Sequence, residues 1–361
     1  MKQVSSVIYA VALISALGGC GTKDSSSTTT PTTATASAVV DDPQLQSSVV
    51  NATHGDAISA SADQSASGAS LRDGGSSDAT GSSDDDTSTI TKTCAVSGAT
   101  AVVTISSTIS RTKTDTKKSG KVTLKHVATG SGTATRTWSR TDGAAVACNT
   151  AASGANVDFK NPSGLKLDLA FERSREVVNT FTSTALTRTS TKSFKASGKR
   201  AVTWSSNDVA ADNATTYVRN KSIVITDVTH SLVMTNKDGV TVSSSIAINT
   251  TVDKPLVVKV ERSKTDNTVT GKTIVSGQVV AKKDSDATIT TTYADFKLGT
   301  DECKPVSGTA TIVIADSAGT VLKTLVLEAG TTSDGELKDK DSGVEVEGFS
   351  LDNCDTEDKK I

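Results

Sequence analysis

Aromatic residues, proline, methionine and histidine are scarce in this 361-residue chain. It has two Trp, three Tyr, six Phe, five Pro, two Met and three His, so a packed core has to be built mainly from Val, Ile, Leu and Ala. The sequence also lacks a G-x-S-x-G elbow, an H-E-x-x-H pair and a P-loop. None of the histidines (His54, His126 and His230) lies in a recognisable catalytic pattern. These absences argue against an enzyme.

From residue 90 onward the chain is rich in Thr, Val and Ile, which favour pleated strands. Leu165, Leu167, Leu169 and Phe171 alternate with polar or small residues, the period of a half-buried strand. The run 236–239, Asn-Lys-Asp-Gly, predicts a tight hairpin turn between two further strand patterns. We therefore expect an all-β body over 90–361, an antiparallel meander that forms a broad sheet, a sandwich or a partly closed barrel.

The N-terminus has the order of an export signal. Lys2 precedes a short apolar run, and small residues lead to Leu17-Gly18-Gly19-Cys20. This stretch resembles a bacterial lipoprotein signal with its lipobox. The resemblance implies that residues 1–19 are removed and that Cys20 carries acyl chains, which would make the membrane a partner of this protein. Because Gly21 stands where an inner-membrane retention signal usually has Asp, the resemblance favours the outer membrane of a Gram-negative envelope, on its periplasmic or surface side.

An acidic, low-complexity segment follows the lipobox. Residues 20–89 are dominated by Ser, Thr, Ala, Gly and Asp, which bury too little apolar surface to offset the entropy of ordering them. We therefore predict a disordered tether there, with a short helix over about 43–64 as an alternative for that part. Residues 24–90 carry ten Asp and one Arg, a net charge of −9, whereas 91–327 carry 31 basic and 19 acidic residues, a net charge of +12.

Four cysteines remain once Cys20 is assigned to lipid. An even number in an exported chain predicts disulfides, and four cysteines allow three pairings. We expect Cys94–Cys148 and Cys303–Cys354, because these pairs close loops of similar size within each end of the body. No C-x-x-C pair and no neighbouring histidine supports a metal site instead.

The strongest candidate for ligand binding is the run Arg136-Thr137-Trp138-Ser139-Arg140. Residues two apart on a strand share a face, so both arginines should flank the indole of Trp138 on one side of the sheet. Such a face can stack on a ring and pair with an anionic group. The alternative is that the arginine stems cover a half-buried tryptophan.

Acidic side chains raise the question of a metal. Asp339, Asp341 and Gly343 have the spacing that begins some calcium loops, but the other carboxylates of such a loop are missing. Asp84-Asp85-Asp86 is equally unspecific. We therefore expect no metal and no cofactor.

Two functions fit these features. The first is a non-enzymatic, lipid-anchored cell-envelope protein whose β body makes envelope or surface contacts. The alternative is a binding module or carrier for anionic glycans or lipids, suggested by the basic body between acidic ends. No nucleic-acid partner is expected.

Overall fold

The computed structural model describes a protein built almost entirely of β-strands. The described residues are 46, 50, 84–117, 122–149, 156–157, 164–183, 186–205, 216–263, 269–283, 287–298, 305–329, 335–347 and 349. Within these ranges no helix is long and apolar enough to cross a bilayer. The strands there are β1 (Asp84–Ser97), β2 (Thr100–Lys117), β3 (Val122–Arg140), β4 (Cys148–Asn149), β5 (Asn156–Val157), β6 (Leu165–Ser183), β7 (Thr187–Trp204), β8 (Thr216–Thr235), β9 (Thr241–Thr250), β10 (Leu256–Ser263), β11 (Val269–Lys283), β12 (Ala287–Leu298), β13 (Pro305–Asp316), β14 (Val321–Glu328) and β15 (Glu336–Asp339).

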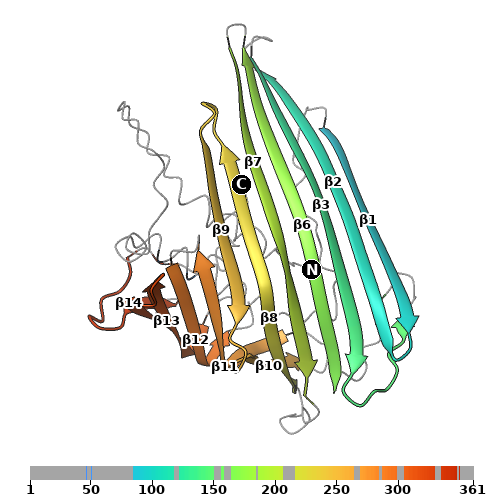
Figure 1. The fold of residues 1–361 in the computed structure, drawn as a ribbon, viewed down its shortest axis with the longest axis vertical. Helices are drawn as coiled ribbons and strands as arrows, with labels where there is room; N and C mark the ends of the chain where they lie inside the picture. Colours follow the sequence, from blue (N-terminus) through green and yellow to red (C-terminus); the bar gives the residue numbers. More distant parts are fainter. Residues whose placement is uncertain are drawn as a thin grey trace.

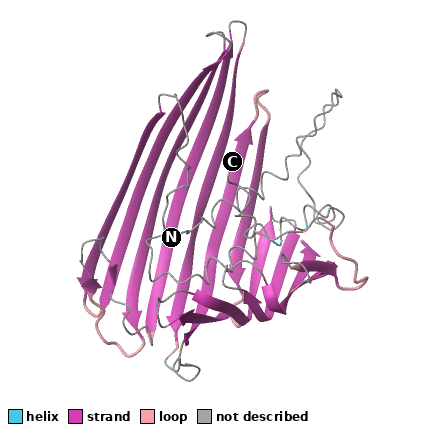
Figure 2. Cartoon of the chain, turned by 180° about the vertical axis from the view of Figure 1, so that it is seen from behind, coloured by secondary structure: helices cyan, strands magenta, loops and turns pink. Residues whose placement is uncertain are grey.

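Most of these strands belong to a single antiparallel sheet. Its order is β1-β2-β3-β6-β7-β8-β10-β11-β12-β13-β14-β15, with β9 paired to both β8 and β11. Strands β4 and β5 pair only with each other. The predicted all-β antiparallel meander is therefore confirmed. Its form is a broad sheet in which the short C-terminal strands curl away from one end of the long N-terminal strands (Figure 1, Figure 2).

The long strands extend well beyond the buried core. Strands β2, β3, β6, β7 and β8 are 18 to 20 residues long, or about 60 Å at about 3.3 Å per residue. In β6, Leu165, Leu167 and Leu169 are buried between exposed neighbours, whereas no side chain from Phe171 to Ser183 is buried. The strands thus have a core end and a distal end, and at the distal end the sheet is mostly a single layer.

A break between β9 and β10 bends the sheet. Strand β8 pairs with β10 through 216–223 and with β9 through 228–235, so β9 and β10 act as one interrupted strand. The interruption is matched on β8 by Asp227 at φ 51° and on β11 by Gly277 at φ 129°. A Cβ at Gly277 would lie 2.5 Å from the carbonyl oxygen of Pro255. Irregular positions in a strand, such as Asp227 and Gly277, increase the twist of a sheet and bend it, as β-bulges do. This is consistent with the curl of the strands that follow.

The main core lies on one face of the sheet, at the core end. It joins residues of the long strands, such as Leu167 and Ile223, to residues of the C-terminal strands, such as Ile312 and Leu327. Strand β12 supplies an edge-on aromatic pair, Tyr293 and Phe296, with ring centroids 5.9 Å apart. The curl therefore places the inner faces of the long strands and of the C-terminal strands in one shared core.

The boundary between tether and body differs from the predicted one. Strand β1 begins at Asp84, six residues before the expected start at 90, because its pairing with β2 continues to Asp84↔Lys113. Two residues of the predicted tether, Gln46 and Val50, are helical and 2 % exposed, and Val50 belongs to the main core. Both lie within the alternative helix at about 43–64, whose other residues are outside the described ranges.

A disulfide ties the first strand to the loop after β3. Cys94 in β1 is bonded to Cys148 in β4, with the Cα atoms 6.0 Å apart, so the first predicted bridge is present. Cys303 and Cys354, the predicted second bridge, lie outside the described residues, as does Cys20.

Candidate functional site

The two faces of the long strands have different chemistry. Pairing runs without a register shift from β1 through β2, β3 and β6 to β7, so alternate residues can be assigned to faces across all five strands. We call the face that carries Trp138 the basic face and the other one the hydroxyl face. On β2, every residue of the hydroxyl face from Thr104 to Thr114 is Thr or Ser.

The basic face concentrates cations. Its acidic residues are confined by backbone pairing to the distal end, where Asp84 lies opposite Lys113, Asp86 opposite Arg111 and Asp115 opposite Leu124; the side chains of these three Asp are outside the described set. The acidic side chains of β6 (Asp168, Glu172 and Glu176) are all on the hydroxyl face. The cations of the basic face are Lys92, Arg111, Lys113, Arg136, Arg140, Arg173, Arg175, Arg188, Lys192 and Arg200.

The pKa values of three cations on this face are lowered, mainly by burial. Burial lowers the pKa of Lys192, and the charge of Arg175 lowers it further. Burial, followed by the charge of Arg136, does the same to the pKa of Lys92. Burial also lowers the pKa of Arg136 itself. Each of these shifts disfavours the charged form, so a bound anion would stabilise the protonated lysines.

The predicted Arg136, Trp138 and Arg140 cluster lies on the basic face but inside the core. Trp138 is 0 % and Arg136 3 % exposed. The indole of Trp138 stacks on that of Trp204, with centroids 5.9 Å apart and planes at 26°. At the strand end, the Nε atom of Arg140 is 3.5 Å from a carboxylate oxygen of Asp142. The expectation that the three side chains share a face is thus confirmed. The burial of Arg136 and Trp138 supports the packing alternative, which the sequence could not decide because Trp204 is distant along the chain.

Farther along the same face, aromatic rings lie close to arginines. The guanidinium of Arg173 is 5.9 Å from the ring centroid of Phe171 and 5.8 Å from that of Phe194. The guanidinium of Arg200 is 5.5 Å from the ring centroid of Phe171. These contacts hold cations over apolar rings in the region between the core and the distal end.

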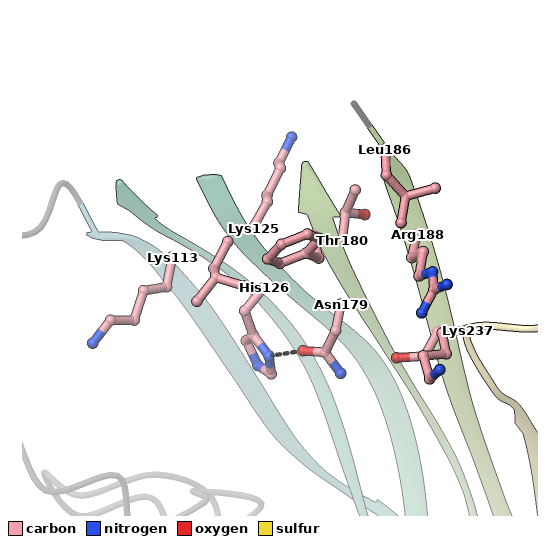
Figure 3. Close-up of a pocket in the computed structure, with 11 residues that line it drawn as sticks. Lys113, Lys125, His126, Asn179, Thr180, Leu186, Arg188 and Lys237 are labelled. Carbon is pink, nitrogen blue, oxygen red and sulfur yellow. Dashed lines mark hydrogen bonds between the residues drawn. The ribbon is translucent and has the colours of Figure 1, made fainter. Parts of the chain in front are cut away.

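The distal end of the basic face contains an open pocket of about 440 Å³, which we call the distal pocket (Figure 3). One row of its lining runs straight across four strands, because Lys113 pairs with His126, His126 with Asn179, and Asn179 with Ser190. The Nδ1 atom of His126 is 2.7 Å from the Oδ1 atom of Asn179. This contact leaves the Asn179 amide nitrogen able to donate to a ligand.

A second row supplies apolar surface and another cation. Leu124 pairs with Phe181, and Phe181 with Arg188. Leu124 is 38 %, Phe181 37 % and the nearby Leu186 45 % exposed, a cluster of large apolar side chains in contact with solvent. Backbone pairing places Asp115 opposite Leu124 at the outer edge, where the Asp115 side chain is outside the described set.

Cations lie on both sides of these rows. Figure 3 shows Lys113 and Arg188 on opposite sides of the His126–Asn179 pair. Lys237, from the turn between β8 and β9, also lines the pocket and forms an exposed ion pair of 3.4 Å with Asp238. No Asp or Glu is among the described lining residues. The distal pocket therefore combines positive charge, hydrogen-bond donors and an exposed aromatic ring.

Other candidates from the sequence have structural roles. The carboxylate of Asp339 accepts hydrogen bonds from the backbone N–H groups of Asp341 (3.0 Å) and Ser342 (2.9 Å), and so caps a tight turn. His230 is 2 % exposed and stacks on Phe194, with ring centroids 6.1 Å apart. Among the described residues, no group of three or more His, Cys, Asp or Glu converges to hold a metal. His54 lies outside the described residues.

Sequence reasoning missed the distal pocket because its members are far apart along the chain. Spacing by two residues indicates a shared face within each of three pairs: Leu124 and His126, Asn179 and Phe181, and Arg188 and Ser190. The sequence around each pair does not show which residues of the other strands lie beside it. Comparison with protein-family models, with curated proteins and with solved structures finds no match to this chain.

Proposed function

We propose that this chain is a non-enzymatic, lipid-anchored cell-envelope protein whose β body binds anionic glycans or lipids on its basic face. The lipobox at Leu17–Cys20 and the acidic stretch after it support anchoring to the outer membrane. The observation that carries the binding function is the excess of cations on the basic face of five paired strands, where ten Lys and Arg side chains lie and backbone pairing places only three Asp within the described strands (Asp84, Asp86 and Asp115).

Solubility alone does not account for this arrangement. A sheet that only needs solvating charges can mix both signs on each face. Here the carboxylates of β6 are confined to the hydroxyl face, whereas the arginines of β6, Arg173 and Arg175, lie on the basic face. A face that keeps like charges together attracts anions, and this attraction weakens as salt screens it.

Anchoring is tested by following the precursor. We expect metabolic labelling with a radiolabelled fatty acid to mark the wild-type protein, and inhibition of the lipoprotein signal peptidase to accumulate the longer form. The Cys20→Ala protein should take up no label. A wild-type protein that carries no lipid, with mobility unchanged by the inhibitor, would contradict anchoring.

Binding is tested with the Cys20→Ala protein, because acyl chains of its own would attach to any vesicle. We expect this protein to sediment with vesicles that contain an acidic glycolipid and to remain in solution with vesicles of neutral phosphatidylcholine. Charge reversal by Arg175→Glu on the basic face should reduce sedimentation. The matched control is Lys195→Glu, because Lys195 is also exposed and lies next to Arg175, on the hydroxyl face of the neighbouring strand. Equal effects of the two substitutions would contradict a face-specific site.

A further inference from the structure

We infer that the distal pocket is a binding site for a phosphorylated sugar. The phosphate would lie beside Arg188 and Lys237, and the sugar ring would lie on Phe181. This inference rests on the proposed function and narrows it to one site and one ligand class.

Phosphate fits the cationic groups better than a carboxylate does. Arg188 from β7 and Lys237 from the turn between β8 and β9 lie on the same side of the His126–Asn179 pair, whereas Lys113 lies on the other side (Figure 3). A carboxylate has only two oxygens, which lie in one plane, whereas a phosphate presents three or more in a tetrahedral arrangement. Arginine pairs with two phosphate oxygens at once, and lysine supplies point charges for the others.

The apolar part of the pocket favours a ligand that carries a ring in addition to its phosphate. Phe181 and Leu124 form an exposed apolar surface beside the cations. The C–H groups on one side of a pyranose ring carry slight positive charge, and the face of an aromatic ring is negative, so the two stack favourably. At about 440 Å³ the pocket is in the range of small-molecule sites and has room for one sugar and its phosphate.

Hydrogen-bonding groups are available for the sugar hydroxyls. His126 and Asn179 are held together by their 2.7 Å contact, which fixes the direction of the Asn179 amide nitrogen. The Ser190 hydroxyl stands next in the same row. A ring seated on Phe181 would have these donors at one edge and Arg188 at the other, because Phe181 pairs with Arg188 on the adjacent strand.

The location suits a ligand at a surface or on a polymer. His126 precedes Trp138 by twelve positions on β3, which places the pocket about 40 Å from the core. The pocket also opens at the free end of the sheet, where the strands are exposed. A sugar phosphate could reach it free in solution or as the headgroup of a glycolipid, and the experiment separates these two sources.

The experiment measures binding of glucosamine 1-phosphate, glucosamine and inorganic phosphate to the Cys20→Ala protein by calorimetry, and records the His126 side-chain resonances by NMR. We expect the sugar phosphate to bind more tightly than either fragment and to shift the His126 signals. Arg188→Ala should weaken sugar-phosphate binding by about tenfold or more, as expected for loss of a hydrogen bond to a charged group. Its control, Lys195→Ala, removes an exposed cation from the other face of β7 and should have no effect.

A second variant tests the stacking. Phe181→Ala should weaken binding of glucosamine 1-phosphate but leave inorganic phosphate unchanged, whereas Val233→Ala, an exposed residue of the hydroxyl face, should change neither. Vesicles bearing a phosphorylated glucosamine lipid provide the second source. If they compete with the free sugar phosphate in the wild-type protein but not in Arg188→Ala, the headgroup occupies the same pocket; if they do not compete, the ligand is the soluble form.

The outcomes also separate this inference from the proposed function. Absence of sugar-phosphate binding, with vesicle binding still sensitive to Arg175→Glu, would overturn the inference and leave the function standing. Loss of both would overturn both. Equal affinity for the sugar phosphate and inorganic phosphate would likewise overturn the inference, because Phe181 would then have no role.

Discussion

The disulfide between Cys94 and Cys148 should contribute a large share of the stability of the body. It closes a loop with a sequence separation of 54 residues. Loop-closure entropy for that length corresponds to about 4 kcal/mol of unfolding free energy at 25 °C. Both cysteine side chains are only half-buried, so truncating them removes little apolar surface. We therefore expect Cys94→Ala/Cys148→Ala to lower the free energy of unfolding by about 4 kcal/mol, mainly through the unfolded state.

Urea unfolding followed by circular dichroism measures this change. With a slope of about 3 kcal/mol per molar urea, the midpoint should fall by about 1.3 M. Reduction of the wild-type protein should lower the midpoint by at least as much, because it would also open the expected Cys303–Cys354 bridge. A double variant within about 1 kcal/mol of the oxidised wild type would refute the reasoning, because the bridge would then not restrict the unfolded chain.

Three further predictions concern the core, a close backbone approach and a turn. Trp138→Ala should lower the free energy of unfolding by about 3–5 kcal/mol in urea melts, because Trp138 is fully buried and stacked on Trp204; a loss under about 1 kcal/mol would contradict that packing. Gly308→Ala should be far more destabilising than Gly319→Ala in thermal melts. Both glycines have a positive φ, +79° and +85° respectively, but only at Gly308 would the new Cβ meet backbone, 2.0 Å from the carbonyl oxygen of Asp295. Equal losses of stability would show that the strain of a positive φ, and not this clash, accounts for the destabilisation. The pKa of Asp339 is lowered, first by the backbone N–H of its turn, so its contribution to stability should be present above about pH 4 and disappear as the pH falls further. Asp339→Asn should accordingly be less stable than wild type at neutral pH and converge with it in acid, whereas a constant difference would refute the assignment.

Local patterns in the sequence were sufficient for the strands and for one hairpin. The alternation from Leu165 to Phe171 appears as buried and exposed positions in β6 because side chains on a strand point to opposite faces. The predicted turn at 236–239 joins β8 to β9, and the Asn236 backbone donates to the carbonyl of Val240 over 2.9 Å. Both signals depend on neighbours within a few residues, which a sequence displays directly.

Long-range register determined what the sequence could not reveal. The break between β9 and β10 exists because β8 and β11 each continue past it, and neither strand is adjacent to the break in the sequence. The cluster at Arg136–Arg140 could be predicted from the sequence because its members are neighbours on one strand. The row from Lys113 to Ser190 is assembled from four strands and becomes visible only once their pairing is known.

The central claim is that the basic face binds anions through charge, and the salt dependence of binding tests it most directly. The measurement is the affinity of the Cys20→Ala protein for vesicles containing an acidic glycolipid, between about 0.1 M and about 1 M salt, where the screening length falls from about 10 Å to about 3 Å. The account predicts a steep loss of affinity over this range, less steep in Arg175→Glu and unchanged in Lys195→Glu. Binding that is independent of salt, or equally strong to neutral vesicles, would contradict it.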